Sequence, residues 1–161
     1  MKKWIFLLAL PLCSMKKSDL DPITWSYSVK QIDKGVLEVH IIAHLAEGWH
    51  IYAMQQPGKI RSIPTSIHFS GSDNSLFQLV GDVQELGKLI PSQDNATGKV
   101  IVQNVIERSV EYVQRVKTRY AVTSSVSGFI KYQVCNESSC MRPTDQPFTI
   151  ALQSTVNTLI R

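Results

Sequence analysis

Two closely spaced cysteines near the end of the chain are the residues whose chemistry is most distinctive. Cys135 and Cys140 lie five positions apart in the run Tyr-Gln-Val-Cys-Asn-Glu-Ser-Ser-Cys, and the third cysteine of the sequence is Cys13. A thiol pair of this kind can form a structural disulfide. It can also carry out thiol–disulfide exchange, in which one thiolate attacks a partner disulfide and the second thiol resolves the mixed disulfide.

The small loop between the two cysteines bears on this choice. In the chain-entropy model, a disulfide that closes so small a loop stabilises the fold by only ~2 kcal/mol, against ~4.7 kcal/mol for a loop of about 100 residues. A bond at an exposed turn is also easier for an attacking thiolate to reach. Small exported domains nevertheless keep local disulfides for modest gains in stability. Spacing alone therefore leaves both the structural and the redox interpretation open.

A metal site is a third interpretation of the thiols. The sequence contains four histidines, but Cys-x4-Cys differs from the usual Cys-x2-Cys zinc spacing, and an exported compartment favours oxidation. His40 and His44 fall on the polar face of a predicted strand, where solvated side chains are commoner than ligands. We therefore expect no metal and no cofactor, with metal delivery through the reduced thiols and His50 as the alternative.

The N-terminus has the zones of a secretory signal in their usual order. Lys2 and Lys3 precede the apolar residues 4–12, a run shorter than the ~20 residues that a membrane-spanning helix needs. We predict a signal peptide over residues 1–14, or up to about residue 20, and a periplasmic or otherwise exported location. A lipid anchor at Cys13 is the alternative. No later apolar run approaches spanning length, so we expect no membrane span after signal removal.

Charge and length restrict the class of protein further. The formal net charge is +4, and loss of Lys2 and Lys3 lowers it by two, to +2. This charge is too small and too dispersed for nucleic-acid binding, which normally needs a clustered basic face. A hydrophobic content of 43% with 19% charged residues is ordinary for a globular domain. The roughly 140 remaining residues can bury one core, so we expect a monomeric single domain.

Apolar residues recur with a period of two over most of the chain. In residues 36–45, five apolar side chains share one face, while Glu38, His40 and His44 share the other, which is the pattern of a half-buried strand. Residues 25–29 show the same alternation. Further predicted strands cover residues 65–69, 77–80, 100–106, 110–116, 122–134 and 148–152.

This spacing of short strands predicts an all-β fold, an immunoglobulin-like β-sandwich, over residues 20–153. Residues 81–89 and 155–161 are predicted to be weakly helical, and residues 87–98 to form a long loop. The C-terminal tail is assigned to residues 154–161.

Local patterns also predict surroundings for individual side chains. Tyr132 and Val134 share the inward face of the strand over residues 122–134, so Cys135 is expected on its solvent-leaning face. The polar residues between the cysteines predict a turn, so that the disulfide would join the two arms of a hairpin near its tip. Trp25 and Trp49 are expected to pack in the core.

The motifs resemble those of a known family. The cysteine run, followed by Met-Arg-Pro at residues 141–143 and the strand 148–152, resembles the N-terminal periplasmic domain of the thiol:disulfide interchange protein DsbD. Residues 47–52, Glu-Gly-Trp-His-Ile-Tyr, are similar to that family's glycine–aromatic signature, and residues 25–29 fit its opening strand. The resemblance covers roughly residues 20–153.

The resemblance implies an immunoglobulin-like domain with protein-disulfide reductase activity. Cys140 would form the mixed disulfide and Cys135 would resolve it, with Tyr52 and His50 beside the pair and His50 in the place of a tyrosine. The implied partners are a thioredoxin-like electron donor and oxidised, disulfide-containing periplasmic proteins. The family's aromatic cap loop has no match, because residues 86–90 contain no Phe or Tyr. The alternative is a non-catalytic binding module with a structural disulfide.

Overall fold

The computed structural model describes residues 21–71, 76–95, 97–118 and 124–153. The predicted signal peptide and C-terminal tail lie outside these residues. None of the described segments is a helix with the length and apolar character needed to cross a membrane. The described strands are β1 (Ile23–Asp33), β2 (Val36–Leu45), β3 (His50–Tyr52), β4 (Ser66–Ser70), β5 (Phe77–Gly87), β6 (Ile90–Asp94), β7 (Ile101–Glu107), β8 (Ser109–Thr118), β9 (Ser124–Tyr132), β10 (Val134–Cys135) and β11 (Thr144–Leu152).

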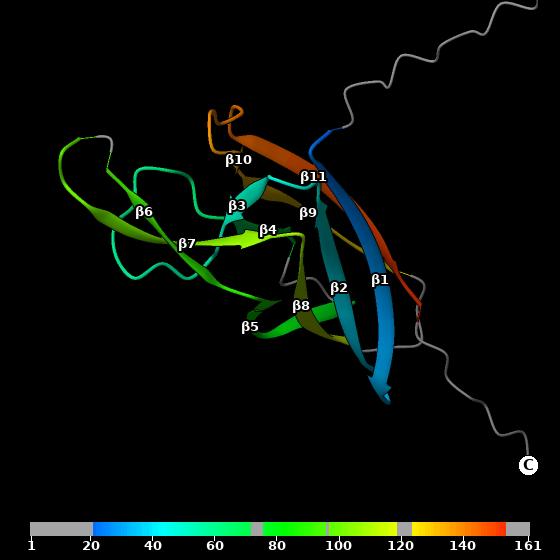
Figure 1. Ribbon diagram of the computed structural model, residues 1–161. Coiled ribbons are helices and arrows are strands. Elements are labelled where there is room, and N and C mark those ends of the chain that lie inside the picture. Colours follow the sequence, from blue (N-terminus) through cyan, green and yellow to red (C-terminus); the bar gives the residue numbers. More distant parts are fainter. Residues whose placement is uncertain (1–20, 72–75, 96, 119–123, 154–161) are drawn as a thin grey trace, which may run out of the picture.

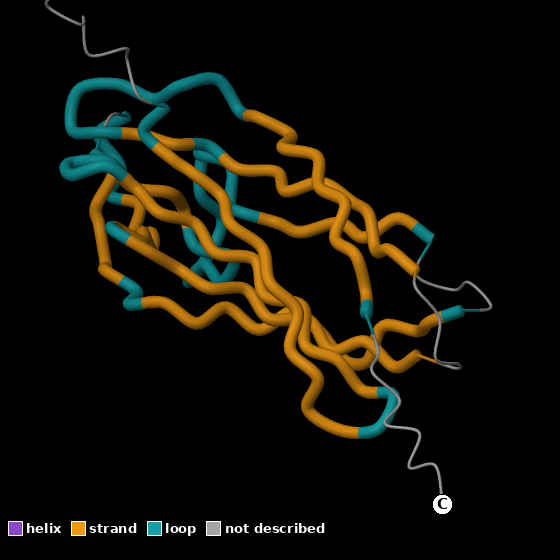
Figure 2. Tube along the Cα trace, turned by 90° about the vertical axis from the view of Figure 1, so that its right-hand side faces the viewer, coloured by secondary structure: helices purple, strands orange, loops and turns teal. Residues whose placement is uncertain are grey.

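These strands form three antiparallel sheets (Figure 1). The sheet β1-β2-β8-β5 and the sheet β11-β9-β4 contribute side chains to one common core, as the two layers of a sandwich do. The third sheet, β10-β3-β7-β6, contains one of the cysteines. Figure 2 shows the long strands running side by side through the molecule, joined by turns at both ends. The predicted all-β, immunoglobulin-like sandwich is confirmed.

The core follows directly from the alternation in the sequence. In β2 every second residue from Leu37 to Ala43 is buried, while the residues that alternate with them are only half-buried. Burying a side chain such as Leu or Val contributes about 1.5–3 kcal/mol, so a strand with this pattern has one strongly preferred register. Trp25 and Trp49 are partly buried against the same core, as predicted.

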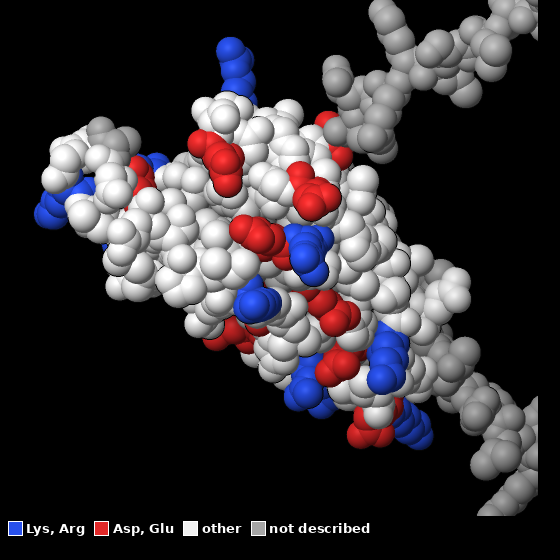
Figure 3. All heavy atoms as spheres, viewed as in Figure 1, with Lys and Arg blue, Asp and Glu red and all other residues white. Residues whose placement is uncertain are grey.

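Charged side chains of both signs share the outer face of the first sheet. Figure 3 shows acidic and basic atoms side by side over this face. Arg115 Nε donates to Glu38 Oε1 at 3.1 Å, and His40 Nδ1 lies 2.6 Å from Glu111 Oε1. His40 therefore pairs with a carboxylate of the neighbouring strand β8.

Two predictions about the middle of the chain were wrong. Residues 81–89 are not helical, because β5 continues through them to Gly87 and pairs with β8. Gly81 has a φ of 69°, and the register shifts between Val80 and Gln84, so a glycine-containing bulge interrupts the alternation. Residues 87–98 are not a long loop, because they contain β6, paired with β7. β6 is an edge strand, where Pro91 is tolerated without a backbone N–H.

Candidate functional site

The chain changes sheets just before the first cysteine. β9 ends at Tyr132, and after Gln133 the short strand β10 pairs with β3, placing Cys135 opposite His50. As a result Cys135 turns inward and is only 1% exposed, so the prediction of a solvent-leaning Cys135 was wrong. Counting alternate positions failed because it assumed one uninterrupted strand from residue 122 to residue 134.

A disulfide joins Cys135 to Cys140 across the tip of a hairpin, as predicted. The two cysteines form an antiparallel bridge with their Cα atoms 4.0 Å apart. Beside them, the amide of Met141 donates to the carbonyl of Val134 at 2.9 Å. Unlike Cys135, Cys140 is exposed. The disulfide therefore links a cysteine in the interior to a cysteine at the surface.

The turn between the cysteines is held by a single side chain. Asn136 Oδ1 accepts hydrogen bonds from the amides of Ser138 and Ser139, at 2.9 and 2.8 Å. The amide of Asn136 donates in turn to the carbonyl of Ser139 at 2.9 Å. An asparagine whose side chain binds the amide two residues later is an Asx turn. The hairpin tip thus has hydrogen bonds that do not depend on the disulfide.

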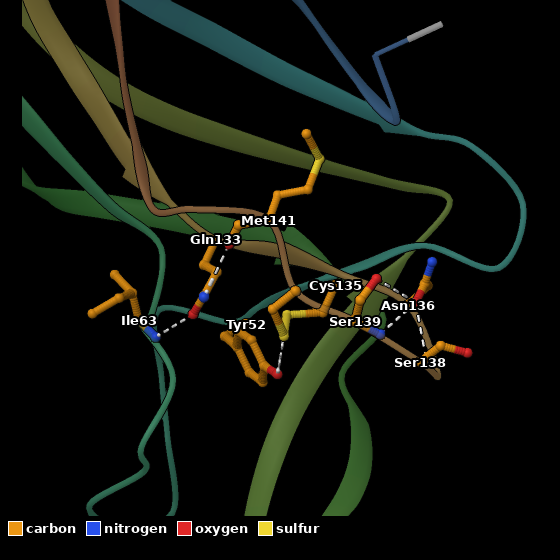
Figure 4. Close-up of a disulfide and its surroundings, with 9 residues drawn as sticks. Tyr52, Ile63, Gln133, Cys135, Asn136, Ser138, Ser139 and Met141 are labelled. Atoms are coloured by element: carbon orange, nitrogen blue, oxygen red, sulfur yellow. Dashed lines mark hydrogen bonds between the residues drawn. A yellow bond between two sulfur atoms is a disulfide. The ribbon is translucent and has the colours of Figure 1, made fainter. Parts of the chain in front are cut away.

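Tyr52 and His50 both lie at the disulfide, where the resemblance placed them. The Tyr52 hydroxyl donates to Cys135 Sγ at 3.5 Å and lies 4.0 Å from Cys140 Sγ. Figure 4 shows the tyrosine ring directed at the pair. The His50 ring meets the Tyr52 ring edge-on, with centroids 5.5 Å apart. The structure therefore brings together all four residues predicted from the sequence.

The electrostatics at this end of the site favour a neutral imidazole. Burial lowers the pKa of His50 below its ordinary value of 6.5, and the nearby carboxylate of Glu107 opposes this only in part. The polar group in contact with the sulfurs is the Tyr52 hydroxyl. A hydrogen-bond donor at this position stabilises a thiolate relative to a thiol.

The interior sulfur is covered by aliphatic side chains. Cys135 forms a small apolar cluster with Tyr52 and Val105, and Ile60 and Ile90 pack against it. Ile60 comes from the segment between β3 and β4, and Ile90 is the first residue of β6. Residues 86–90, which carry no aromatic side chain, therefore do reach the site, but only through an isoleucine.

Sequence analysis did not identify Gln133 as part of the site. Its side-chain nitrogen donates to the carbonyl of Met141 at 3.1 Å, and its oxygen accepts from the amide of Ile63 at 3.3 Å (Figure 4). Gln133 thus ties the cysteine hairpin to the segment after β3. No local signal could reveal this, because the partner Ile63 lies 70 positions away. The Asx turn, in contrast, was readable from asparagine at the start of a polar turn.

The part of the chain that the structure describes contains no group of three or more His, Cys, Asp or Glu side chains arranged to hold a metal ion. The groups that the site brings together are the two sulfurs, the Tyr52 hydroxyl and the His50 imidazole.

The similarity of this chain to known proteins lies in its fold. No family model and no curated protein matches the sequence. Among solved structures, the reduced N-terminal domain of DsbD from Neisseria meningitidis is similar, with 18% identity and a TM-score of 0.49, over 80% of this chain and 86% of that one. The N-terminal periplasmic domain of ScsB from Proteus mirabilis is 15% identical with a TM-score of 0.48, over 86% of this chain and 49% of that one.

A third similar structure is the complex between the DsbD N-terminal and PilB N-terminal domains from Neisseria meningitidis. It shows 14% identity and a TM-score of 0.47, over 86% of this chain and 95% of that one. At these identities the similarity concerns the fold alone. These structures come from the same kind of domain that the sequence motifs resemble, and membership of the DsbD family stays a prediction for this chain.

Proposed function

We propose that this chain is an exported thiol–disulfide exchange module that passes electrons from a thioredoxin-like donor to oxidised periplasmic proteins. The observation that carries the proposal is the asymmetry of the two cysteines. Cys140 is exposed, Cys135 is 1% exposed, and the Tyr52 hydroxyl lies within 4.0 Å of both sulfurs. Exchange needs one sulfur that a partner can reach and one that it cannot, because the second must stay free to resolve the mixed disulfide.

The exchange runs in two balanced steps. In the dithiol form, the Cys140 thiolate attacks one sulfur of the partner disulfide, the partner S–S bond breaks, and the released partner thiolate takes up a proton. The Cys135 thiolate then attacks Cys140 Sγ, which forms the Cys135–Cys140 bond and releases the second partner thiolate to be protonated. Two electrons pass to the partner. A dithiol of the thioredoxin-like donor reverses the sequence and restores both thiols.

Tyr52 and His50 shape these steps without transferring electrons. The Tyr52 hydroxyl can donate to whichever sulfur carries the negative charge, since it lies 3.5 Å from one and 4.0 Å from the other. His50 on β3 pairs with Cys135 on β10 in the antiparallel ladder, at the same end of the sheet. Because burial keeps its imidazole neutral at neutral pH, it acts through its position and not as a cation.

An exported location fits this chemistry, since an oxidising compartment supplies the disulfides to be reduced. Within the described residues no helix crosses a membrane. The donor is assigned to the thioredoxin-like class on the resemblance to the DsbD family. The acceptor is any protein disulfide that an exposed hairpin tip can approach.

A trapping experiment tests the assignment of the two cysteines. Cys135→Ala leaves Cys140 as the exposed thiol and removes the resolving group. It should therefore accumulate a mixed disulfide with a thioredoxin-like protein that lacks its own resolving cysteine and whose remaining cysteine carries a thionitrobenzoate disulfide. The Cys140 thiolate attacks that disulfide and thionitrobenzoate leaves. Cys140→Ala is the matched control, because it leaves only the buried thiol and should trap nothing. Equal trapping by both variants, or trapping by Cys140→Ala alone, would contradict the proposed roles.

A further inference from the structure

A pocket of about 500 Å³ opens beside the hairpin of β6 and β7. One wall is the segment from Pro57 to Arg61, between β3 and β4, and the other runs from Lys99 to Val102, which leads into β7 and includes its first two residues. Two valines on the second wall are unusually accessible, with Val100 57% and Val102 47% exposed. Exposed β-branched residues two positions apart offer an extended peptide a place for an aliphatic side chain.

Lysines stand on both walls of this pocket. Lys59 and Lys99 both line it, and both are exposed. Within the residues that the structure describes, neither lies within ion-pair distance of a carboxylate. The third cation, Arg61, is already neutralised, because it binds Asp94 through two hydrogen bonds of 2.7 and 3.1 Å. Figure 3 shows basic atoms near the end of this hairpin, on the left of the view, with acidic atoms beside them.

The pocket shares a wall with the disulfide site. Ile60 lines the pocket and also packs against the cluster that contains Cys135. Along β7, Glu107 pairs with His50 at the cysteine end, and Ile101 lines the pocket at the other end. Six strand residues at about 3.3 Å each separate these positions by roughly 20 Å. An extended partner segment of about six residues therefore reaches from the disulfide to the pocket.

We infer that this pocket is a docking site for an extended acidic segment with aliphatic side chains, carried by the proteins that exchange disulfides with Cys140. Its carboxylates meet Lys59 and Lys99, and an aliphatic side chain packs on Val100 and Ile60. The inference rests on the proposed function for the identity of the partner but not for the binding itself. Charge pairs at such a rim mainly raise the association rate and select among partners.

Binding is tested first without any redox step. A fluorescein-labelled peptide of alternating Glu and Leu is titrated against the oxidised protein by fluorescence anisotropy at low ionic strength. The double variant Lys59→Glu/Lys99→Glu should bind it at least about tenfold more weakly, since each pair changes from attraction to repulsion. Lys117→Glu is the matched control, because Lys117 is exposed on β8, in another sheet. It should leave the affinity unchanged.

Three outcomes of the peptide titration would overturn the inference: no binding by the unaltered protein, equal losses in the double variant and in Lys117→Glu, or equal binding of an all-Glu peptide. Equal binding of the all-Glu peptide would mean that Val100 and Ile60 do not contribute to binding. Preferential binding of anionic phosphatidylglycerol vesicles through the same lysines would also overturn it, in favour of a membrane surface.

A kinetic experiment then links the pocket to exchange. Two disulfide peptides are compared, one with the Glu-Leu segment six residues from its cysteine and one with a Gly-Ser segment there. The double variant should slow exchange with the first peptide about tenfold and leave reduction by dithiothreitol unchanged. Peptide binding without any exchange would show that the proposed function has failed while the docking site stands. Equal exchange rates for both peptides would show that the docking site has failed while the proposed function stands.

Discussion

Breaking the disulfide should leave this domain folded, with only a modest loss of stability. The perturbation is Cys140→Ser, which removes the bond at its exposed end and changes no buried side chain. In the chain-entropy model, a loop of six residues corresponds to ~2 kcal/mol. The hairpin tip also keeps the hydrogen bonds that the amides of Ser138 and Ser139 donate to Asn136 Oδ1, and the one that the Met141 amide donates to the Val134 carbonyl. These bonds limit the further loss, because the turn does not need the sulfurs to close.

Urea unfolding measures this loss in three samples: the oxidised protein, the reduced protein and Cys140→Ser. With a slope of about 2 kcal/mol per molar urea, a loss of ~2 kcal/mol moves the midpoint down by about 1 M in the last two samples alike. Cys135→Ser is the contrasting variant. This substitution places a hydroxyl at a position that is 1% exposed. The free energy of unfolding should therefore fall by about 1–3 kcal/mol more than in Cys140→Ser. Unfolding of Cys140→Ser in buffer, or a loss above about 4 kcal/mol, would refute the reasoning and make the bond a structural anchor.

Three further predictions follow from individual contacts. Tyr52→Phe removes a hydrogen bond worth ~1 kcal/mol to the thiolate and should lower the reduction potential by about 20 mV in a glutathione titration; an unchanged potential would contradict the contact. Gly128→Ala places a Cβ against the backbone carbonyl oxygen of His68 and 2.7 Å from Phe148 Cζ and should cost about 3 kcal/mol in urea unfolding, whereas Gly58→Ala, with no atom within 4 Å, should cost far less. Burial raises the pKa of Glu85 above 4.5, so its folded form keeps a proton longer than its unfolded form. Stability should therefore fall as pH rises from 4.5 through the raised pKa, and Glu85→Gln should remove that slope in thermal unfolding.

The sequence predicted those parts of the fold in which one face of a strand is buried. β2 and β8 were recognisable because apolar side chains fill most of the alternate, buried positions along them. β6 and the second half of β5 were missed for local reasons. The bulge at Gly81 shifts the register. β6, with Pro91 and three consecutive polar residues, lies at a sheet edge where little is buried. Alternation carries no information where the backbone departs from a regular ladder.

The site was predictable where it depends on residues close in sequence, and unpredictable where it depends on pairing between sheets. The spacing of the cysteines and the polar turn were enough to predict a disulfide at a hairpin tip. The burial of Cys135 depends on the change of partner after Gln133, from β4 to β3. The contacts of Ile60 and Ile90 with the cysteine cluster depend on the same pairing. His50 and Tyr52 were placed by resemblance, since nothing in their local sequence points to a thiol.

The reduction potential of the Cys135–Cys140 pair tests the central claim most directly. The protein is equilibrated with defined ratios of reduced and oxidised glutathione or dithiothreitol, and its free thiols are counted after alkylation. A working couple should titrate above about −300 mV, in the range of exchange proteins. A potential below about −300 mV would show a bond that resists cellular thiols, and would favour a binding domain with a structural disulfide.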